Sequence, residues 1–471
     1  MSTSATRGSV AHPSRAERAQ RGVDARRTTP LAALAEHVVA DRGDPVSLLE
    51  KQAAGRVPDL VPLRYGRMAA TAFTFYRGAA AIMADDLSRA PTTGLRTQLC
   101  GDAHLSNFGI FATPERRLAF DVNDFDETHP GPFDWDVKRL VASLAVAADE
   151  NGFSAKKRRK ITRACAAEYR ETMTRQAQLG NLAVWYSHIE AAAGITELRD
   201  ELDSAEKKRA RSVLKKARRR DSVQALSKLT TVVDGTRRII STPPLVVPIE
   251  ELYAGEDLES LYRDTQRRLD AYAQTLQKDR RLLYDQFHMV QIARKVVGVG
   301  SVGTRTWIIL MLGADDADPL FLQVKEAKRS VLSDYVECPS FATEGERVVY
   351  GQRLMQQASD IFLGWERGAD LEGVEHDFYV RQLRDGKGSA LIESQTPTVM
   401  TLYGRMCARA LAYAHARGGD RIAVAAYLGD GDEFDHVMAE FADTYAEQNV
   451  RDHSALLDAI DSRRVAATTD T

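Results

Sequence analysis

The segment CGDAHLSNFGIFATPERRLAFDVNDFDE occupies Cys100–Glu127 and gathers four aspartates, a histidine and two asparagines around two short apolar runs. The runs are Phe108–Phe111 and Leu118–Val122, and the polar turn ATPERR joins them. Two apolar runs on either side of such a turn predict a β-hairpin. Polar loops at its open ends hold Asp102, His104 and Asn107 before the first strand and Asn123, Asp124 and Asp126 after the second.

A hairpin brings its open ends together, so we expect Asp102, Asn107 and Asp124 to share one small volume. Carboxylate and amide oxygens are hard ligands, suited to a Mg²⁺ ion that also holds substrate phosphates. The alternative is that these residues only form turns and helix caps, which Asp and Asn favour in any protein.

The two polar loops resemble the catalytic segment of protein-kinase-like enzymes, especially aminoglycoside and choline kinases. The resemblance lies in a GD-x-H-x-x-N loop, a hairpin and then an acidic DF-D segment. It implies that Asp102 is the catalytic base and that Asn107 and Asp124 hold the metal. Asp126 is the candidate ligand of a second metal ion.

A second group of candidate residues begins at Lys295, where the sequence reads KVVGVGSVGTRTWIILML. Gly298, Gly300 and Gly303 satisfy G-x-G-x-x-G, a pattern shared by dinucleotide-binding loops and kinase loops. A dinucleotide-binding loop must open a helix, but the residues after Gly303 are mostly β-branched or aromatic and predict a strand. We therefore expect strand, loop and strand, with Gly298, Gly300, Ser301 and Gly303 binding the phosphates of ATP.

The next predicted strand, PLFLQVKEA, carries Lys325. Lys325 matches the strand lysine with which kinases neutralise the nucleotide phosphates. A strand lysine that points to solvent is the alternative. Kinases pair this lysine with a helical glutamate, for which Glu346 is the candidate and Glu344 a competitor. The strand His376–Asp385 stands where kinases have the hinge that binds adenine.

The order of these parts is reversed relative to ordinary kinases, because the catalytic loop precedes the glycine loop and its lysine. We therefore expect an α+β, protein-kinase-like bilobal fold in circularly permuted order, with a helical large lobe and a small antiparallel β lobe. The expected units are a flexible basic arm (1–43), the catalytic part of the large lobe (44–200), a connector with a basic helix (201–284), the nucleotide-binding β lobe (285–390) and C-terminal helices of the large lobe (391–471).

Further motifs are RYGRM (64–68), FTFYRG (73–78) and PGPFDWDVKRL (130–140). With CGDAHLSNFG and NDFDE they are similar to the bacterial family known as domain of unknown function 2252, over most of the chain from about residue 44. That family is grouped with the kinase-like fold. The resemblance implies that Asp136 braces the catalytic loop, although Asp136 could equally be the N-cap of a helix. The motif HARGGD invites a second catalytic-loop interpretation around Asp420, but Ala425 stands where the metal-binding asparagine would be.

Composition sets further bounds on the 471 residues. The net charge of −2 predicts no general affinity for nucleic acid or membranes. Residues 206–220 hold nine basic residues and one acidic residue, which predicts a solvated helix; the absence of interleaved aromatic residues makes nucleic-acid binding an unfavoured alternative. Four scattered cysteines, no apolar run long enough for a membrane span and no signal peptide lead us to expect a cytoplasmic protein.

Together these features predict a Mg²⁺- and ATP-dependent phosphotransferase that acts on a hydroxyl acceptor, either a small molecule or a protein. Nucleotidyl transfer stays open at this point. The first alternative is a nucleotide-binding scaffold without catalysis. The second is a metallophosphoesterase, whose sites also begin with GD-x-H, but the GNH segment that supplies further ligands is missing.

Overall fold

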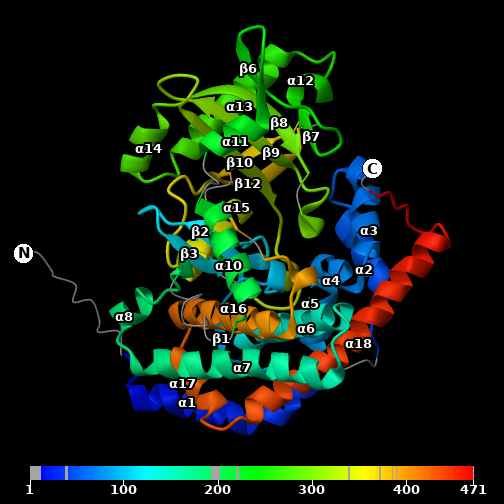
Figure 1. Cartoon of the computed structure of the whole chain (residues 1–471), viewed down its shortest axis with the longest axis vertical. Helices are drawn as coiled ribbons and strands as arrows, with labels where there is room; N and C mark the ends of the chain where they lie inside the picture. The colour runs from blue at the N-terminus through cyan, green and yellow to red at the C-terminus, as the bar shows by residue number, and fades with distance from the viewer. Residues whose placement is uncertain are drawn as a thin grey trace, which may run out of the picture.

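The computed structural model describes residues 12–37, 41–192, 202–218, 222–296, 298–337, 340–370, 373–383, 386–388 and 390–469. The fold is α+β, as expected, with antiparallel sheets and a majority of helix. In Figure 1 the main sheet lies in the upper half, and most of the long helices lie below it. We call these halves the β region and the helical region.

The β region is built on a six-stranded antiparallel sheet in the order β11-β12-β10-β9-β8-β7. Its strands are β7 (Val246–Pro248), β8 (His288–Lys295), β9 (Thr306–Leu312), β10 (Pro319–Ala327), β11 (Gly364–Ala369) and β12 (Glu375–Gln382). The predicted sequence of strand, glycine loop, strand and lysine strand is confirmed. Strand β7 lies in the segment assigned to the connector, so the sheet begins earlier in the chain than residue 285.

Side chains of β10 alternate between the two faces of this sheet. Leu320, Leu322 and Val324 belong to an apolar cluster with Leu269 and Tyr272 of helix α13 (Leu258–Ala273). The residues between them face the opposite way, and among these Gln323 and Lys325 line a cavity beside the helical region. Helices α11 (Ser222–Leu229), α12 (Ile249–Leu252) and α14 (Lys278–Tyr284) and the hairpin β5–β6 (Thr230–Val233, Thr236–Ile239) complete this region.

The helical region packs around two long neighbouring helices, α7 (Ala155–Gln178) and α16 (Pro397–Gly418). Helix α6 (Phe133–Glu150) is buried almost throughout and packs against both of them. Around these lie α2 (Pro45–Ala53), α3 (Val61–Ala69), α4 (Ala72–Gly78), α5 (Ala80–Arg89), α8 (Asn181–Trp185), α17 (Arg421–Leu428) and α18 (Glu433–Asp461). No helix in the described part of the chain is both long and apolar enough to cross a membrane.

Between the two regions lies the predicted hairpin, formed by β2 (Phe108–Ala112) and β3 (Leu118–Val122) with Phe108 opposite Val122. Strand β1 (Arg96–Leu99) leads into it and pairs with β4 (His129–Pro132). Helix α15 (Glu344–Met355) contacts β11 and β12 on one side and the main apolar core, through Val348 and Val349, on the other. The hairpin and α15 therefore connect the β region to the helical region.

The expected flexible arm is wrong for residues 15–28, which form helix α1 (Arg15–Thr28) packed along α17 (Figure 1). Ser14 and Glu17 form a capping box at its start. Arg18 and Arg26 then form ion pairs with Asp420 and Glu433. The helix forms although it lacks large apolar residues, because charge pairs and a close backbone approach at Gly22 fix it to the protein.

The predicted basic helix is present as α10 (Ser204–Arg218), but it is not wholly solvated. Val213, Leu214 and Ala217 pack on the main core, and Glu206 accepts a hydrogen bond from Thr396 Oγ1 at 2.6 Å. The last two residues of the predicted segment, 219–220, lie outside the described residues. Cys100, Cys165 and Cys407 are buried free thiols; Cys338 likewise lies outside the described residues.

Candidate active site

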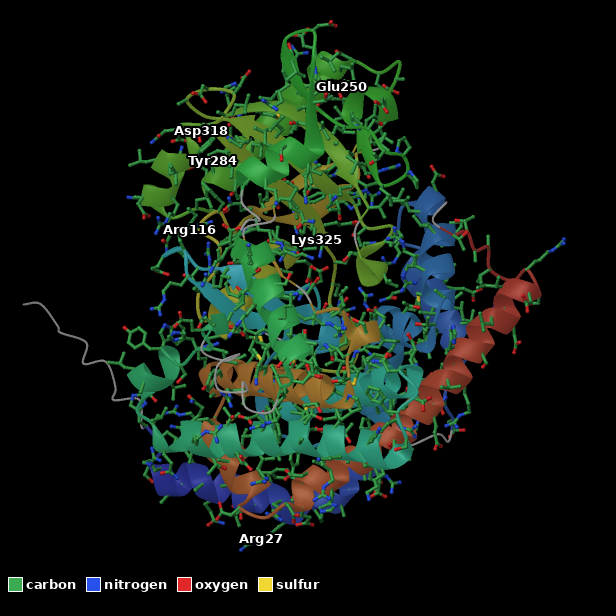
Figure 2. The ribbon with its side chains drawn as sticks, in the orientation of Figure 1. Arg27, Arg116, Glu250, Tyr284, Asp318 and Lys325 are labelled. Atoms are coloured by element: carbon green, nitrogen blue, oxygen red, sulfur yellow. The ribbon has the colours of Figure 1, made fainter. Side chains whose placement is uncertain are left out.

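A cavity of about 320 Å³ lies between the sheet and the helical region. Figure 2 labels Lys325 where the β region meets the helical region. The residues that line the cavity include Asp102, Asn107, Asp124, Asp126, Gly298, Gly300, Ser301 and Lys325. The structure thus brings together most of the predicted site residues. Gly303 and Glu346 are the two that do not line the cavity.

The Lys325 ammonium lies between the carboxylates of the acidic loop. Its Nζ is 2.6 Å from Asp126 Oδ2 and 3.6 Å from Asp124 Oδ2. Tyr379, opposite Lys325 on β12, donates a hydrogen bond of 2.7 Å to Asp126 Oδ1. Lys325 is 3% exposed, so its charge depends on these partners.

The two aspartates differ in their electrostatics. Burial and the neighbouring Asp126 raise the pKa of Asp124, although Lys325 opposes this shift. Burial would also raise the pKa of Asp126, but Lys325 and the Tyr379 hydroxyl hold it below its ordinary value. Asp126 is therefore the ionised partner of Lys325. Asp124 is the carboxylate that can more readily leave the Lys325 ammonium and bind a metal ion.

The predicted pairing of Lys325 with Glu346 is wrong, and Asp126 takes that position. Glu346 lies in the first turn of α15, where its carboxylate accepts the Ala342 amide and its own amide binds the Thr343 side chain. The competitor Glu344 pairs instead with Arg347 at 2.5 Å. Both glutamates stabilise the N-terminus of α15. The first turn of a helix has unpaired amides and the positive end of the helix dipole, and carboxylates interact favourably with both.

Arg347 supplies the contact that α15 makes with the acidic loop. Its guanidinium donates to the carbonyl oxygens of Asp126 at 3.0 Å and Thr128 at 2.5 Å. It also donates to the Lys328 carbonyl, at the end of the lysine strand, at 2.7 Å. One buried arginine therefore fixes the acidic loop and the lysine strand relative to each other.

Asp102 lines the cavity and lies on the loop after β1. Arg139 Nε donates to its carboxylate at 2.8 Å. Burial raises the pKa of Asp102, and the Arg139 charge opposes the shift. Gly101 just before it has a φ of +82°, and a Cβ there would overlap the Glu127 carbonyl, so the loop requires glycine at this position.

Asp136 braces this loop, as the resemblance implied. Its carboxylate accepts the amides of Cys100 at 2.8 Å and Gly101 at 3.0 Å, and it contacts His415 Nε2 at 3.2 Å. Helix α6 begins at Phe133, so Asp136 is not its N-cap. Asp420, by contrast, caps α17 and binds Arg18, so it belongs to the interface with α1 and not to the cavity.

The donor set in the cavity fits a hard divalent cation that also takes phosphate oxygens. Asn107 donates its Nδ2 to the Asp102 carbonyl at 2.8 Å, which leaves the amide oxygen as its ligand atom. Asp124 is 30% exposed towards the same cavity. Asp126 fits a second metal less well, since Lys325 and Tyr379 occupy its oxygens. The described residues contain no cluster of three or more His, Cys, Asp or Glu arranged around a single metal position.

The glycine loop connects β8 and β9 and is held by the helical region. Val57 N donates to the Gly303 carbonyl at 2.7 Å, and Arg56 Nη1 donates to the Val302 carbonyl at 2.5 Å. Ser301 Oγ lies 3.4 Å from Asp126 Oδ2. Gly303 therefore shapes the loop, with a φ of +84°, and Gly298, Gly300 and Ser301 face the cavity.

Sequence reasoning missed the cavity residues Arg56, Arg77, Arg381 and Lys387, and also Tyr379, which binds Asp126. A signal for two of them was present, because Tyr379 and Arg381 are two residues apart on a strand and must share a face. Arg381 donates to the Asn123 carbonyl at 3.1 Å. Burial and the nearby Arg381 lower the pKa of Lys387 to about 7. Of the predicted hinge strand, β12 covers 375–382, and residues 384–385 lie outside the described residues.

No curated protein and no solved structure matches this chain. A sequence model of one protein family matches residues 56–459, which cover the cavity, the acidic loop, the glycine loop and the lysine strand. The protein therefore belongs to the bacterial family described as "uncharacterized protein conserved in bacteria", domain of unknown function 2252.

Proposed function

We propose that this protein is a Mg²⁺- and ATP-dependent phosphotransferase that acts on a hydroxyl acceptor. The observation that carries the proposal is the meeting of Lys325 with the acidic loop inside the cavity that the glycine loop borders. Phosphoryl transfer depends mostly on positioning and charge neutralisation, and it needs these groups around one nucleotide.

The residues have distinct roles in this reaction. Lys325 and the amides of Gly298, Gly300 and Ser301 bind the phosphates of ATP. Asp102 orients the acceptor hydroxyl and takes up its proton. The acceptor oxygen forms the new bond to the γ-phosphorus while the bond to the β–γ bridging oxygen breaks, and ADP leaves with that electron pair. Mg²⁺, held by Asp124 and Asn107, neutralises charge on the phosphates when it is bound.

The topology supports a permuted kinase-like fold. Strands β8, β9 and β10 are neighbours in the sheet. The glycine loop follows β8, and Lys325 lies on β10, which is the third strand when β8 is counted as the first, as in protein kinases. Helix α15 follows the lysine strand, and α16 follows β12 along the chain. The loop with Asp102 and the acidic loop precede all of these elements in the chain but share the cavity with them.

Two measurements test the proposal. In a thermal-shift titration, Mg²⁺ and ATP at about 100 times the Kd should stabilise the protein by about 2.7 kcal/mol. Incubation with γ-labelled and α-labelled ATP and a cell extract should then transfer the γ label alone. Transfer of the α label would indicate nucleotidyl transfer. A shift without transfer would indicate a scaffold, and phosphate release from simple esters without ATP would indicate a phosphoesterase.

A further inference from the structure

Three arginines near the glycine loop lack a carboxylate partner. Arg56 is 9% exposed and Arg64 is fully buried, and each has an Nε atom without a hydrogen-bond partner among the described residues. Arg77, on α4, likewise has a buried Nε without a partner. No ion pair within 4.0 Å joins any of the three to a described residue. Arg64 and Arg77 come from RYGRM and FTFYRG, the motifs that the phosphotransferase chemistry leaves unused.

Several buried arginines elsewhere in the protein pair with carboxylates. Arg42 contacts Asp86 and Asp452 at 2.6 Å, Arg139 contacts Asp102 at 2.8 Å, and Arg170 contacts Asp435 at 2.9 Å. Burying an unpaired cation costs free energy that a counter-anion recovers. Arg56, Arg64 and Arg77 lie together in one corner of the molecule, each with a buried Nε that has no partner among the described residues. Such a concentration of positive charge indicates that a bound anion neutralises it.

The corner opens into the candidate active site. Arg56 and Arg77 line the cavity, and Gln52 and Gly78, which also line it, accept hydrogen bonds from Arg64 Nη2 at 2.8 and 3.0 Å. Arg77 runs alongside the glycine loop, since its Nη2 lies 3.7 Å from the position of a Cβ on Gly298. Asp102 lines the same cavity. An anion bound by Arg77 therefore lies near the proposed base.

Apolar contacts and hydrogen bonds fix the far side of the glycine loop to the helical region. Val299 is buried in a cluster with Val46 and Phe75, and Val302 is buried against Leu60 and Leu63. The hydrogen bonds from Arg56 and Val57 fix the same loop. The glycine loop is thus fixed to the helical region, and the cavity that it borders, at about 320 Å³, has the size of a small-molecule site.

We infer that the acceptor is a small molecule with an anionic group, a phosphate or a carboxylate, which Arg56 and Arg77 bind while its hydroxyl faces Asp102. Planar guanidinium groups suit both anions, because they offer paired N–H donors. This inference rests on the proposed function. The phosphates of ATP could instead neutralise the corner formed by Arg56, Arg64 and Arg77, and these arginines would then need no acceptor anion. The experiment must therefore distinguish an anion of the acceptor from the phosphates of the nucleotide.

The experiment measures the binding of inorganic phosphate, and of succinate as a carboxylate probe, by thermal shift and calorimetry. Each probe is titrated with and without a saturating non-hydrolysable ATP analogue and Mg²⁺. We expect at least one probe to bind equally well in both conditions. Arg77→Gln should raise its Kd about tenfold or more and leave the analogue's Kd within twofold, since a hydrogen bond to a charged group is lost. The probe's Kd for Arg77→Lys should lie between the values for the parent and for Arg77→Gln. The control Arg27→Gln, at a residue 74% exposed on α1, should bind the probe with the parent's Kd.

The outcomes that contradict the inference are specific. Competition between the probe and the analogue would assign the corner to the nucleotide phosphates. If neither probe binds, or if Arg77→Gln leaves the probe's Kd unchanged, the proposed acceptor site is wrong. If the analogue itself fails to bind while phosphate binding depends on Arg77, the proposed function fails and the acceptor role falls with it, but an anion site remains.

Discussion

Lys325 Nζ lies 2.6 Å from Asp126 Oδ2, although 199 residues of chain separate the two. The contact joins the lysine strand of the β region to the acidic loop after the hairpin. It places the main cationic and anionic groups of the candidate site within one cavity.

Lys325→Met should abolish phosphoryl transfer and weaken the fold. Without the ammonium, Asp124 and Asp126 face each other unpaired. We expect a loss of about 1–3 kcal/mol in the free energy of unfolding, less than for a fully buried pair because the carboxylates are 30% and 27% exposed. Turnover should fall by about 10²–10³ or more. Urea unfolding and the γ-label assay measure the two effects, and unchanged turnover would exclude Lys325 from the site.

Asp124→Asn and Asp126→Asn should affect different steps. Asp124→Asn removes a ligand charge but keeps the shape, so it should abolish Mg²⁺- and ATP-dependent turnover with little change in Tm. Asp126→Asn should lower Tm as well, because the carboxylate that holds Lys325 and Tyr379 is lost. Parent-rate turnover by Asp124→Asn would show that the metal assignment is wrong.

Glu346→Gln should keep parent-like turnover, since Glu346 serves the start of α15 and does not contact Lys325. Loss of its charge near a helix N-terminus should cost about 0.3–1 kcal/mol. Steady-state rates of Glu346→Gln and Asp126→Asn, compared side by side, decide which carboxylate supports the lysine. A deficit in Glu346→Gln as large as that in Asp126→Asn would restore the original assignment.

Glu127 should make stability depend on pH. Burial raises its pKa to about 7, from an ordinary value of 4.5. The native state therefore keeps this proton between pH 4.5 and 7 while the unfolded chain releases it. The free energy of unfolding should fall as the pH rises through that window and level off above it. Glu127→Gln should flatten the decline in Tm between pH 5 and 7, whereas Glu259→Gln, at a residue 82% exposed, should not. Equal slopes in all three proteins would contradict the shift.

Gly22→Ala should destabilise the protein even though alanine favours helices by up to about 1 kcal/mol. A Cβ at Gly22 would overlap the Ala423 carbonyl, so α1 must move away from α17. The matched control is Gly43→Ala, where a Cβ meets nothing within 4 Å and the change should stay within about 0.5 kcal/mol. Thermal unfolding compares the two variants. Equal Tm values would show that α1 is loosely attached.

Local sequence patterns predicted the parts of the site that depend on neighbouring residues. The hairpin follows from two apolar runs and a polar turn, and the strand after Gly303 follows from its β-branched residues. The resemblance to kinases then placed Lys325 near Asp124. The partner of Lys325 could not be predicted in this way. The choice between Glu346 and Asp126 depends on the position of α15 relative to the lysine strand, which is a long-range property of the fold.

Long-range contacts also explain the other errors. Helix α1 looked unable to fold because its apolar content is low, but its stability comes from Asp420, Glu433 and the backbone of α17. The sequence assigned no role to Arg64 or Arg77 beyond their place in the motifs RYGRM and FTFYRG. Only the folded chain shows that no carboxylate meets them and that Arg77 lines the cavity beside the glycine loop.

The attachment of the glycine loop to Arg56 and Val57 has a consequence for the kinetic cycle. If the proposed nucleotide leaves by displacement of that loop, the two hydrogen bonds must break and Val299 and Val302 must leave their apolar contacts. Departure of ADP should then be slower than transfer, so the first turnover should appear as a pre-steady-state burst. Val302→Ser should loosen the loop, shrink the burst and raise the steady-state rate.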